Sequence, residues 1–301
     1  MLWNLGRLLG TGFGVSIVLA LALRLLVNQF VAPTLRRSML RDSGGGESDQ
    51  PPPVHPLLSA VHSCVLAVSL AAALLAGVTV QRGELAAPTQ YWHWLPIAGL
   101  AVALVYSPAT LLPTLLRRIG WAAAAAWSAW LLVPTWPNLE PTQAVMIPML
   151  AVYLFFLGWL FERAANRARA GQHFTVLIVT AITLAVCVAV LFSLEYAEVA
   201  LMVAASLAGC WLSTIIVKCE QASIVPLMAC TSLLLGGIAF VSYVYPQPPI
   251  YEFLLVPFVP TAMLFSPAEG DGRLGFWRPM LASAVVLVVV LIVLLIQHGF
   301  A

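Results

Sequence analysis

The residues best placed to do chemistry are an arginine and a histidine inside apolar stretches. Arg24 lies in the apolar stretch 8–31, His62 lies in the stretch 57–80, and Asn28 follows Arg24 by one helical turn. A charge at membrane depth is costly and often functional, so these side chains predict a buried polar cluster. The alternative is that the Arg24 guanidinium reaches the lipid headgroups at the end of its flexible stem.

Three glutamates near the ends of apolar stretches form a second set of candidates. Glu195 and Glu198 flank a tight turn between two such stretches, and Glu252 begins a proline-rich one. Acidic side chains around an entrance can concentrate cations there. The alternative is that these acids mark solvated loop ends. Together with Arg24 and His62, they are the candidate polar contacts of a solute.

Small residues at a four-residue spacing predict close helix packing. Gly10 and Gly14 form a G-x-x-x-G pattern, and Ala205 and Gly209 have the same spacing. Such spacing lets two helix backbones approach each other closely. Since no Lys-Ser or Lys-Thr pair follows the glycines, they do not form a nucleotide-binding loop.

No metal or cofactor site is predicted. The five cysteines lack C-x-x-C or zinc-type spacing, and the His, Asp and Glu residues show no ligand spacing. Serines and threonines lack a His and Asp partner at suitable positions, so we predict no catalytic residue. An intramembrane lipid-modifying enzyme, which would lack a visible nucleophile and base, ranks third behind the two functions given below.

The composition predicts an integral membrane protein whose partner is the lipid bilayer. Of the 301 residues, 61% are apolar and only 9% are charged, whereas a soluble domain carries roughly 25% charged residues. This excludes a cytosolic enzyme, a disordered chain and a secreted disulfide scaffold. The net charge is only +2. A nucleic-acid-binding protein would carry a basic stripe, so this class of protein is excluded.

A membrane-spanning helix needs roughly 20 mostly apolar residues. The sequence contains ten apolar stretches of suitable length. Because lipid offers no partner to backbone amides, we predict an all-α bundle of ten transmembrane helices. The third, fourth and ninth have the least certain ends, and Pro257 and Pro260 could break the ninth. The predicted spans are 8–31, 57–80, 91–112, 119–135, 143–161, 173–194, 197–217, 223–245, 250–266 and 279–298.

The basic residues predict the orientation of these helices. With the N-terminus outside, eleven of the fourteen Lys and Arg residues fall on the cytoplasmic side, and only Arg7 and Arg82 fall in outer segments. Cytoplasmic loops retain Lys and Arg because these residues are hard to translocate. We therefore predict that both ends lie outside. Abundant Ala and Leu, together with a single Lys, favour a GC-rich bacterial genome. We therefore expect the protein in the bacterial inner, or plasma, membrane.

The chain is predicted to be a single transmembrane domain, 1–301, with one long loop. Residues 36–56 have the Gly, Ser, Pro and charge content of a flexible tether, and they fall on the cytoplasmic side. Two interpretations of this tether are open: it is a flexible connector that carries a positive-inside signal, or it is a segment that docks a partner.

Two functions remain open at this point. A multi-pass transporter of a small solute would use the five polar candidates along a cavity between the first, second, eighth and ninth spans. A non-catalytic subunit of a membrane complex would instead pack against partner subunits or against its own copies. The sequence identifies neither a substrate nor a coupling ion.

Overall fold

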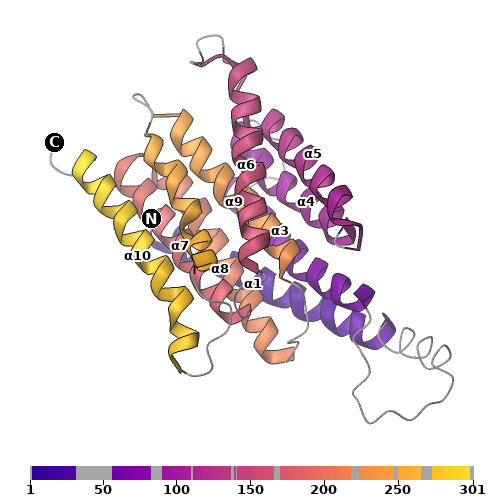
Figure 1. Ribbon diagram of the computed structural model, residues 1–301. Helices are drawn as coiled ribbons and strands as arrows, with labels where there is room; N and C mark the ends of the chain where they lie inside the picture. Colours follow the sequence, from indigo (N-terminus) through magenta and orange to yellow (C-terminus); the bar gives the residue numbers. More distant parts are fainter. Residues whose placement is uncertain are drawn as a thin grey trace, which may run out of the picture.

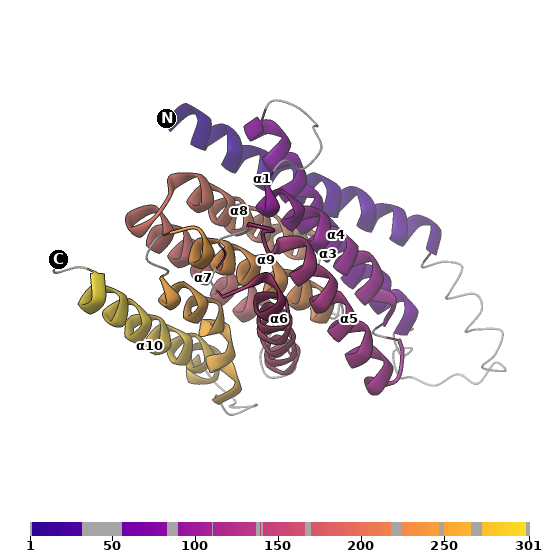
Figure 2. The same ribbon diagram turned by 90° about the horizontal axis from the view of Figure 1, so that it is seen from above.

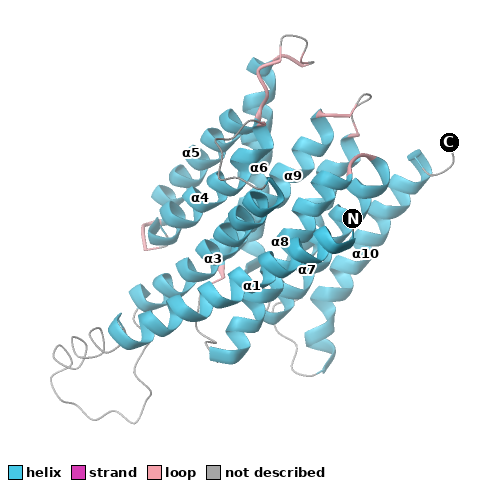
Figure 3. Ribbon diagram, turned by 180° about the vertical axis from the view of Figure 1, so that it is seen from behind, coloured by secondary structure: helices cyan, strands magenta, loops and turns pink. Residues whose placement is uncertain are grey.

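The computed structural model describes most of the chain, and the described part is helical. It covers residues 2–31, 56–82, 90–109, 111–136, 139, 141–165, 170–217, 224–246, 250–265 and 273–298. Within these ranges the elements are helices joined by turns, with no strand (Figure 3). The predicted tether lies outside the described residues, apart from Pro56.

Helical elements coincide with all ten predicted stretches. In chain order they are α1 (Leu2–Leu26), η1 (Val27–Val31), α3 (Pro56–Arg82), η2 (Tyr91–Trp94), α4 (Leu95–Ala109), α5 (Thr114–Leu132), α6 (Gln143–Ala165), α7 (Ala170–Leu191), α8 (Leu194–Val217), α9 (Val225–Val244), η3 (Tyr251–Phe265) and α10 (Arg273–His298). Here η1 is a π-helical turn that continues α1, and η2 and η3 are 3₁₀ helices.

Among the described residues, six helices are long and apolar enough to cross a membrane: those of α1, α3, α6, α7, α8 and α9. This is the pattern of a multi-pass helical membrane protein. Shorter apolar helical stretches are Tyr91–Tyr106 in η2 and α4, Tyr251–Phe265 in η3, and Met280–Val293 within α10. The count of ten crossings and the orientation therefore remain predictions. The start of α1 and the end of α10 lie at the same end of the bundle (Figure 2).

Helix α9 occupies the centre of the bundle (Figure 1). Every residue from Pro226 to Tyr243 is buried, and α3, α4, α6 and η3 all pack against it. Two of its hydroxyl side chains bond within the helix: Thr231 Oγ1 donates to the Leu227 carbonyl at 2.8 Å, and Ser232 Oγ donates to the Ala229 carbonyl at 2.8 Å. The middle of the bundle is thus filled by a helix.

Helix α1 packs against α3 and α8 through one ridge of small residues that ends at an arginine. The ridge consists of Gly12, Ser16, Ala20 and Arg24, spaced by four residues and all buried. Ser206 Oγ of α8 donates to the Gly12 carbonyl at 3.3 Å. Such small residues let the two backbones approach closely.

The predicted packing residues divide between this interface and the opposite face of α1. A Cβ atom on Gly209 would lie 2.7 Å from the Phe13 carbonyl oxygen, and the Ala205 methyl group faces Gly12. A Cβ atom on Gly10 or Gly14 would meet no atom within 4 Å. In this chain, Gly12 makes the close contact instead, and packing of Gly10 and Gly14 against another molecule remains a prediction.

The two prolines of the ninth stretch lie in η3, a 3₁₀ helix rather than a broken α-helix. In a 3₁₀ helix the carbonyl of Leu254 would bond to the N–H of residue 257, which proline lacks. Tyr153 of α6 supplies the missing donor, since its hydroxyl lies 3.1 Å from the Leu254 oxygen. A neighbouring helix thus supplies the hydrogen-bond donor for the Leu254 carbonyl. We therefore assign this carbonyl to helix packing rather than to binding of a solute.

Candidate functional site

The Arg24 side chain lies inside the bundle. It has no exposed surface, and its Nη1 donates a hydrogen bond to the Ser213 carbonyl of α8 at 3.2 Å. An arginine that reached the headgroups would be exposed at the protein surface. The burial of Arg24 is what a buried polar cluster predicts, and it is not what a contact with the headgroups predicts.

His62 lies near Arg24 at the same junction of helices. It is buried on α3, and its Nε2 is 3.3 Å from the Asn28 side-chain oxygen. Asn28 belongs to the π-helical turn η1, one turn beyond Arg24. Single π-helical turns in helices occur frequently at functional sites. Arg24, Asn28 and His62 thus lie at one junction, where Arg24 and His62 are buried and Asn28 is exposed.

The end of α8 completes this junction, which we call the Arg24 site: Arg24, Asn28, His62, Cys210 and Ser213. Cys210 Sγ donates to the Leu66 carbonyl of α3 at 3.6 Å, so α8 is held against α3 there. Ser213 is four residues from the last residue of α8. The negative end of a helix dipole lies at its C-terminus and stabilises a nearby cation.

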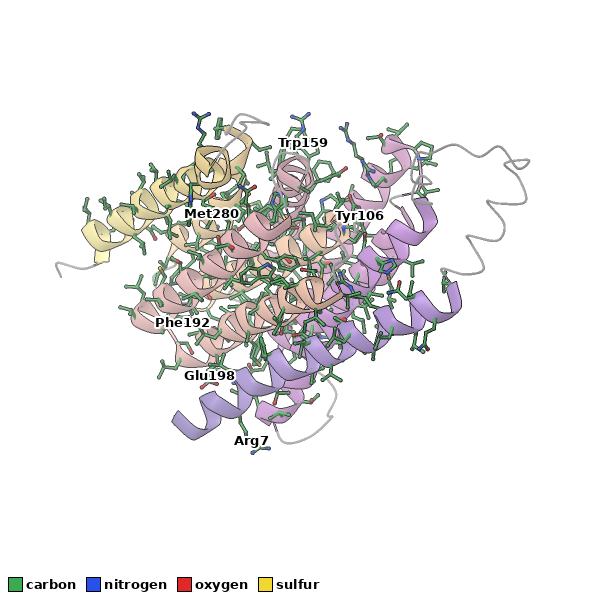
Figure 4. All side chains as sticks on the ribbon, turned by 90° about the horizontal axis from the view of Figure 1, so that it is seen from below. Arg7, Tyr106, Trp159, Phe192, Glu198 and Met280 are labelled. Atoms are coloured by element: carbon green, nitrogen blue, oxygen red, sulfur yellow. The ribbon has the colours of Figure 1, made fainter. Side chains whose placement is uncertain are left out.

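The predicted glutamates do not join the Arg24 site. Glu198 accepts a hydrogen bond from Gln81 Nε2 of α3 at 3.0 Å, and Glu195 is exposed one turn earlier. Fifteen residues of α8 separate Glu198 from Ser213, or roughly 22 Å along a helix. Figure 4 accordingly shows Phe192 and Glu198 at one end of the bundle and Tyr106 at the other.

Glu252 lies apart from both groups. It is partly exposed in the first turn of η3, which packs on α6, α7, α9 and α10. The predicted cavity between the first, second, eighth and ninth spans is therefore not the setting of Arg24. The other four polar candidates instead lie at the two ends of a group formed by α1, α3 and α8.

An aromatic cluster surrounds the Glu198 end of this group. Tyr196 stacks on Phe192 with ring centroids 5.4 Å apart, and it contacts Trp92 and Tyr245 edge-on or tilted. Tyr245 in turn meets Trp136 at 4.8 Å. Aromatic residues at segment ends are typical of the headgroup layer. The sequence shows their positions along the helices, but not that they form one cluster.

A polar cluster that sequence reasoning missed joins α4, α5 and α6. Glu162 accepts a hydrogen bond from the Tyr106 hydroxyl at 3.0 Å and forms an ion pair with Arg117. Trp121 Nε1 donates to the Phe155 carbonyl at 3.1 Å. In the sequence, Arg117 and Glu162 look like ordinary charges beside a loop, since no motif links residues 45 positions apart.

The Arg24 site has the chemistry of an anion or carbonyl contact. A guanidinium offers five N–H donors in a planar fork that suits carboxylate and phosphate groups. No family model, curated protein or solved structure matches this chain. Within the described residues, no group of three or more His, Cys, Asp and Glu side chains could hold a metal ion.

Proposed function

We propose that the protein is a transporter of a small anionic solute, which contacts the Arg24 site during its passage. The observation that carries the proposal is the complete burial of the Arg24 side chain among apolar helices. An arginine at the centre of a membrane helix costs about 2.5–3.5 kcal/mol on insertion scales, and Arg24, in the last turn of α1, bears part of that cost. An apolar residue would fill the space without that cost, so the charge is best explained by a solute.

The arrangement of polar groups along three helices supports the same proposal. Helix α3 carries Gln81 near one end and His62 near the other, and α8 carries Glu198 and Ser213 in the same way. Serines and glycines pack α1 against α8 between these ends. A path along α1, α3 and α8 would thus have a polar group at each mouth and small residues between.

The test is transport by the purified protein in liposomes on a solid-supported membrane. Chloride, inorganic phosphate, acetate, lactate and succinate serve as probes, each applied as a concentration jump. We expect a protein-dependent current with at least one of them. Because hydrogen bonds to charged groups contribute about 1.5–3 kcal/mol, Arg24→Leu should weaken the apparent affinity at least about tenfold, and Arg24→Lys should retain part of it.

Arg7→Gln is the matched control, since Arg7 is exposed at the opposite end of the same helix. It should transport like the wild type. If Arg24→Leu folds and transports as well as the wild type, or if no probe gives a current, Arg24 is not a solute contact. A purely structural Arg24 would instead change thermal stability without any dependence on anions.

A second candidate is a non-catalytic subunit of a membrane complex, and the filled centre of the bundle favours it. With α9 buried throughout, the middle of the described bundle is occupied by a helix. On α1, a Cβ atom added to Gly10 or Gly14 would meet no atom of the described residues within 4 Å, so this face is open there. Co-purification of one membrane protein in a fixed ratio, combined with no anion current, would select this candidate.

A further inference from the structure

Three arginines gather where α5 begins and α6 ends. Arg117 of α5 forms an ion pair with Glu162 of α6, which brings these two helix ends together. Arg118 follows Arg117 on α5, Arg163 follows Glu162 on α6, and both Arg118 and Arg163 are exposed. Among the residues that the structure describes, three positive charges and one negative charge therefore share this corner of the bundle.

Glu162, the carboxylate that the described residues bring to this corner, is already engaged. Glu162 accepts a hydrogen bond from the Tyr106 hydroxyl at 3.0 Å in addition to its ion pair with Arg117. Among the described residues, no Asp or Glu forms an ion pair with Arg118 or Arg163. In the described part of the chain, these two exposed charges thus have no carboxylate partner and can meet an anion from outside.

An aromatic side chain holds one of these charges over apolar surface. The guanidinium carbon of Arg163 lies 4.0 Å from the ring centroid of Trp159, and Trp159 lies at the edge of the molecule (Figure 4). Trp159 in turn meets Phe156 edge-on at 6.2 Å. Phe156 on α6 and Ile119 on α5 are 49% and 56% exposed, so the surface next to the charges is apolar.

We propose that this α5–α6 corner, defined by Arg118, Trp159 and Arg163, binds the headgroup of an anionic phospholipid. Guanidinium groups bind phosphate through charge-assisted, often bidentate hydrogen bonds. Tryptophan rings favour the headgroup layer. The exposed Phe156 and Ile119 side chains offer a surface for an acyl chain, which a free phosphate ion would not use. This site is separate from the Arg24 site and does not depend on transport.

The test is lipid binding to the purified full-length protein in detergent, followed by native mass spectrometry. Phosphatidylglycerol is the probe and phosphatidylcholine the neutral comparison. Since one basic residue near a membrane surface contributes about 1 kcal/mol, Arg118→Gln and Arg163→Gln should each weaken phosphatidylglycerol binding about fivefold, and the double substitution roughly 25-fold. Thermal unfolding of each variant verifies that it is folded.

Arg278→Gln is the matched control, because Arg278 is an exposed arginine near the start of α10 and outside the corner. It should bind phosphatidylglycerol like the wild type. The proposal is overturned if Arg278→Gln loses as much affinity as the double variant, since the effect would then reflect overall charge. Unchanged binding by the double variant overturns it too, and so does displacement of the lipid by millimolar inorganic phosphate.

Discussion

The hydrogen bond from Tyr153 to Leu254 should stabilise the protein only because residue 257 is a proline. Without the Tyr153 hydroxyl, the Leu254 carbonyl would have no donor from position 257 of the 3₁₀ helix. A buried polar group left unsatisfied costs about 1–3 kcal/mol. We therefore expect Tyr153→Phe to lower the free energy of unfolding by that amount, although the ring and its contact with Phe258 remain.

A double-mutant cycle with Pro257→Ala isolates this bond. Alanine at position 257 restores a backbone N–H that can bond to the Leu254 carbonyl in the 3₁₀ register. In this background Tyr153→Phe should cost little, so the cycle should show a coupling energy of about 1–3 kcal/mol. Equilibrium unfolding in mixed micelles titrated with a denaturing detergent measures the four free energies. Equal costs of Tyr153→Phe in both backgrounds would refute the reasoning.

Two further predictions concern glycines and use the same unfolding assay. Gly209→Ala should destabilise the protein by about 1–3 kcal/mol, because its methyl group would press on the α1 backbone, whereas Gly10→Ala should be neutral or stabilising by up to about 1 kcal/mol. Destabilisation by both would contradict the assignment of the packing face. Gly158→Ala should likewise cost about 1–3 kcal/mol, since its methyl group would collide with the Trp121 ring, while Gly120→Ala meets no atom within 4 Å and is the control.

The position of a residue along its helix could be predicted from the sequence, but the side of the helix that it faces could not. Arg24 and His62 have similar predicted depths, and the structure brings them to one junction. The same reasoning could not say whether Arg24 points to lipid or to α8, because the rotation of α1 depends on the surfaces of both helices. Depth follows from the ends of an apolar stretch, whereas rotation follows from packing.

The choice between the two small-residue ridges of α1 shows this limit most clearly. Gly10 and Gly14 form the more familiar pattern, yet Gly12, Ser16 and Arg24 face α8. The physical reason is polarity: a serine and an arginine need partners inside the bundle, whereas a glycine ridge tolerates lipid. Weighing the polar residues at four-residue spacing would have identified the correct face.

The contacts between α4, α5 and α6 lay beyond sequence reasoning for a different reason. Tyr106, Arg117 and Glu162 each occur at the end of a different helix, and only the packing of the three ends brings them together. Each of them is an ordinary residue for the end of a membrane helix. Their shared location therefore became visible only in three dimensions.

The central position of α9 has a consequence for how the chain is made. A ribosome releases α9 after α1 and α3–α8, yet α3, α4 and α6 use α9 as their common packing surface. Before residues 225–244 are inserted, the faces of these earlier helices that pack on α9 must contact lipid or form non-native contacts with one another. Completion of the native bundle thus depends on the synthesis of α9, and a polypeptide that stops before Val225 would leave α3, α4 and α6 without their common core.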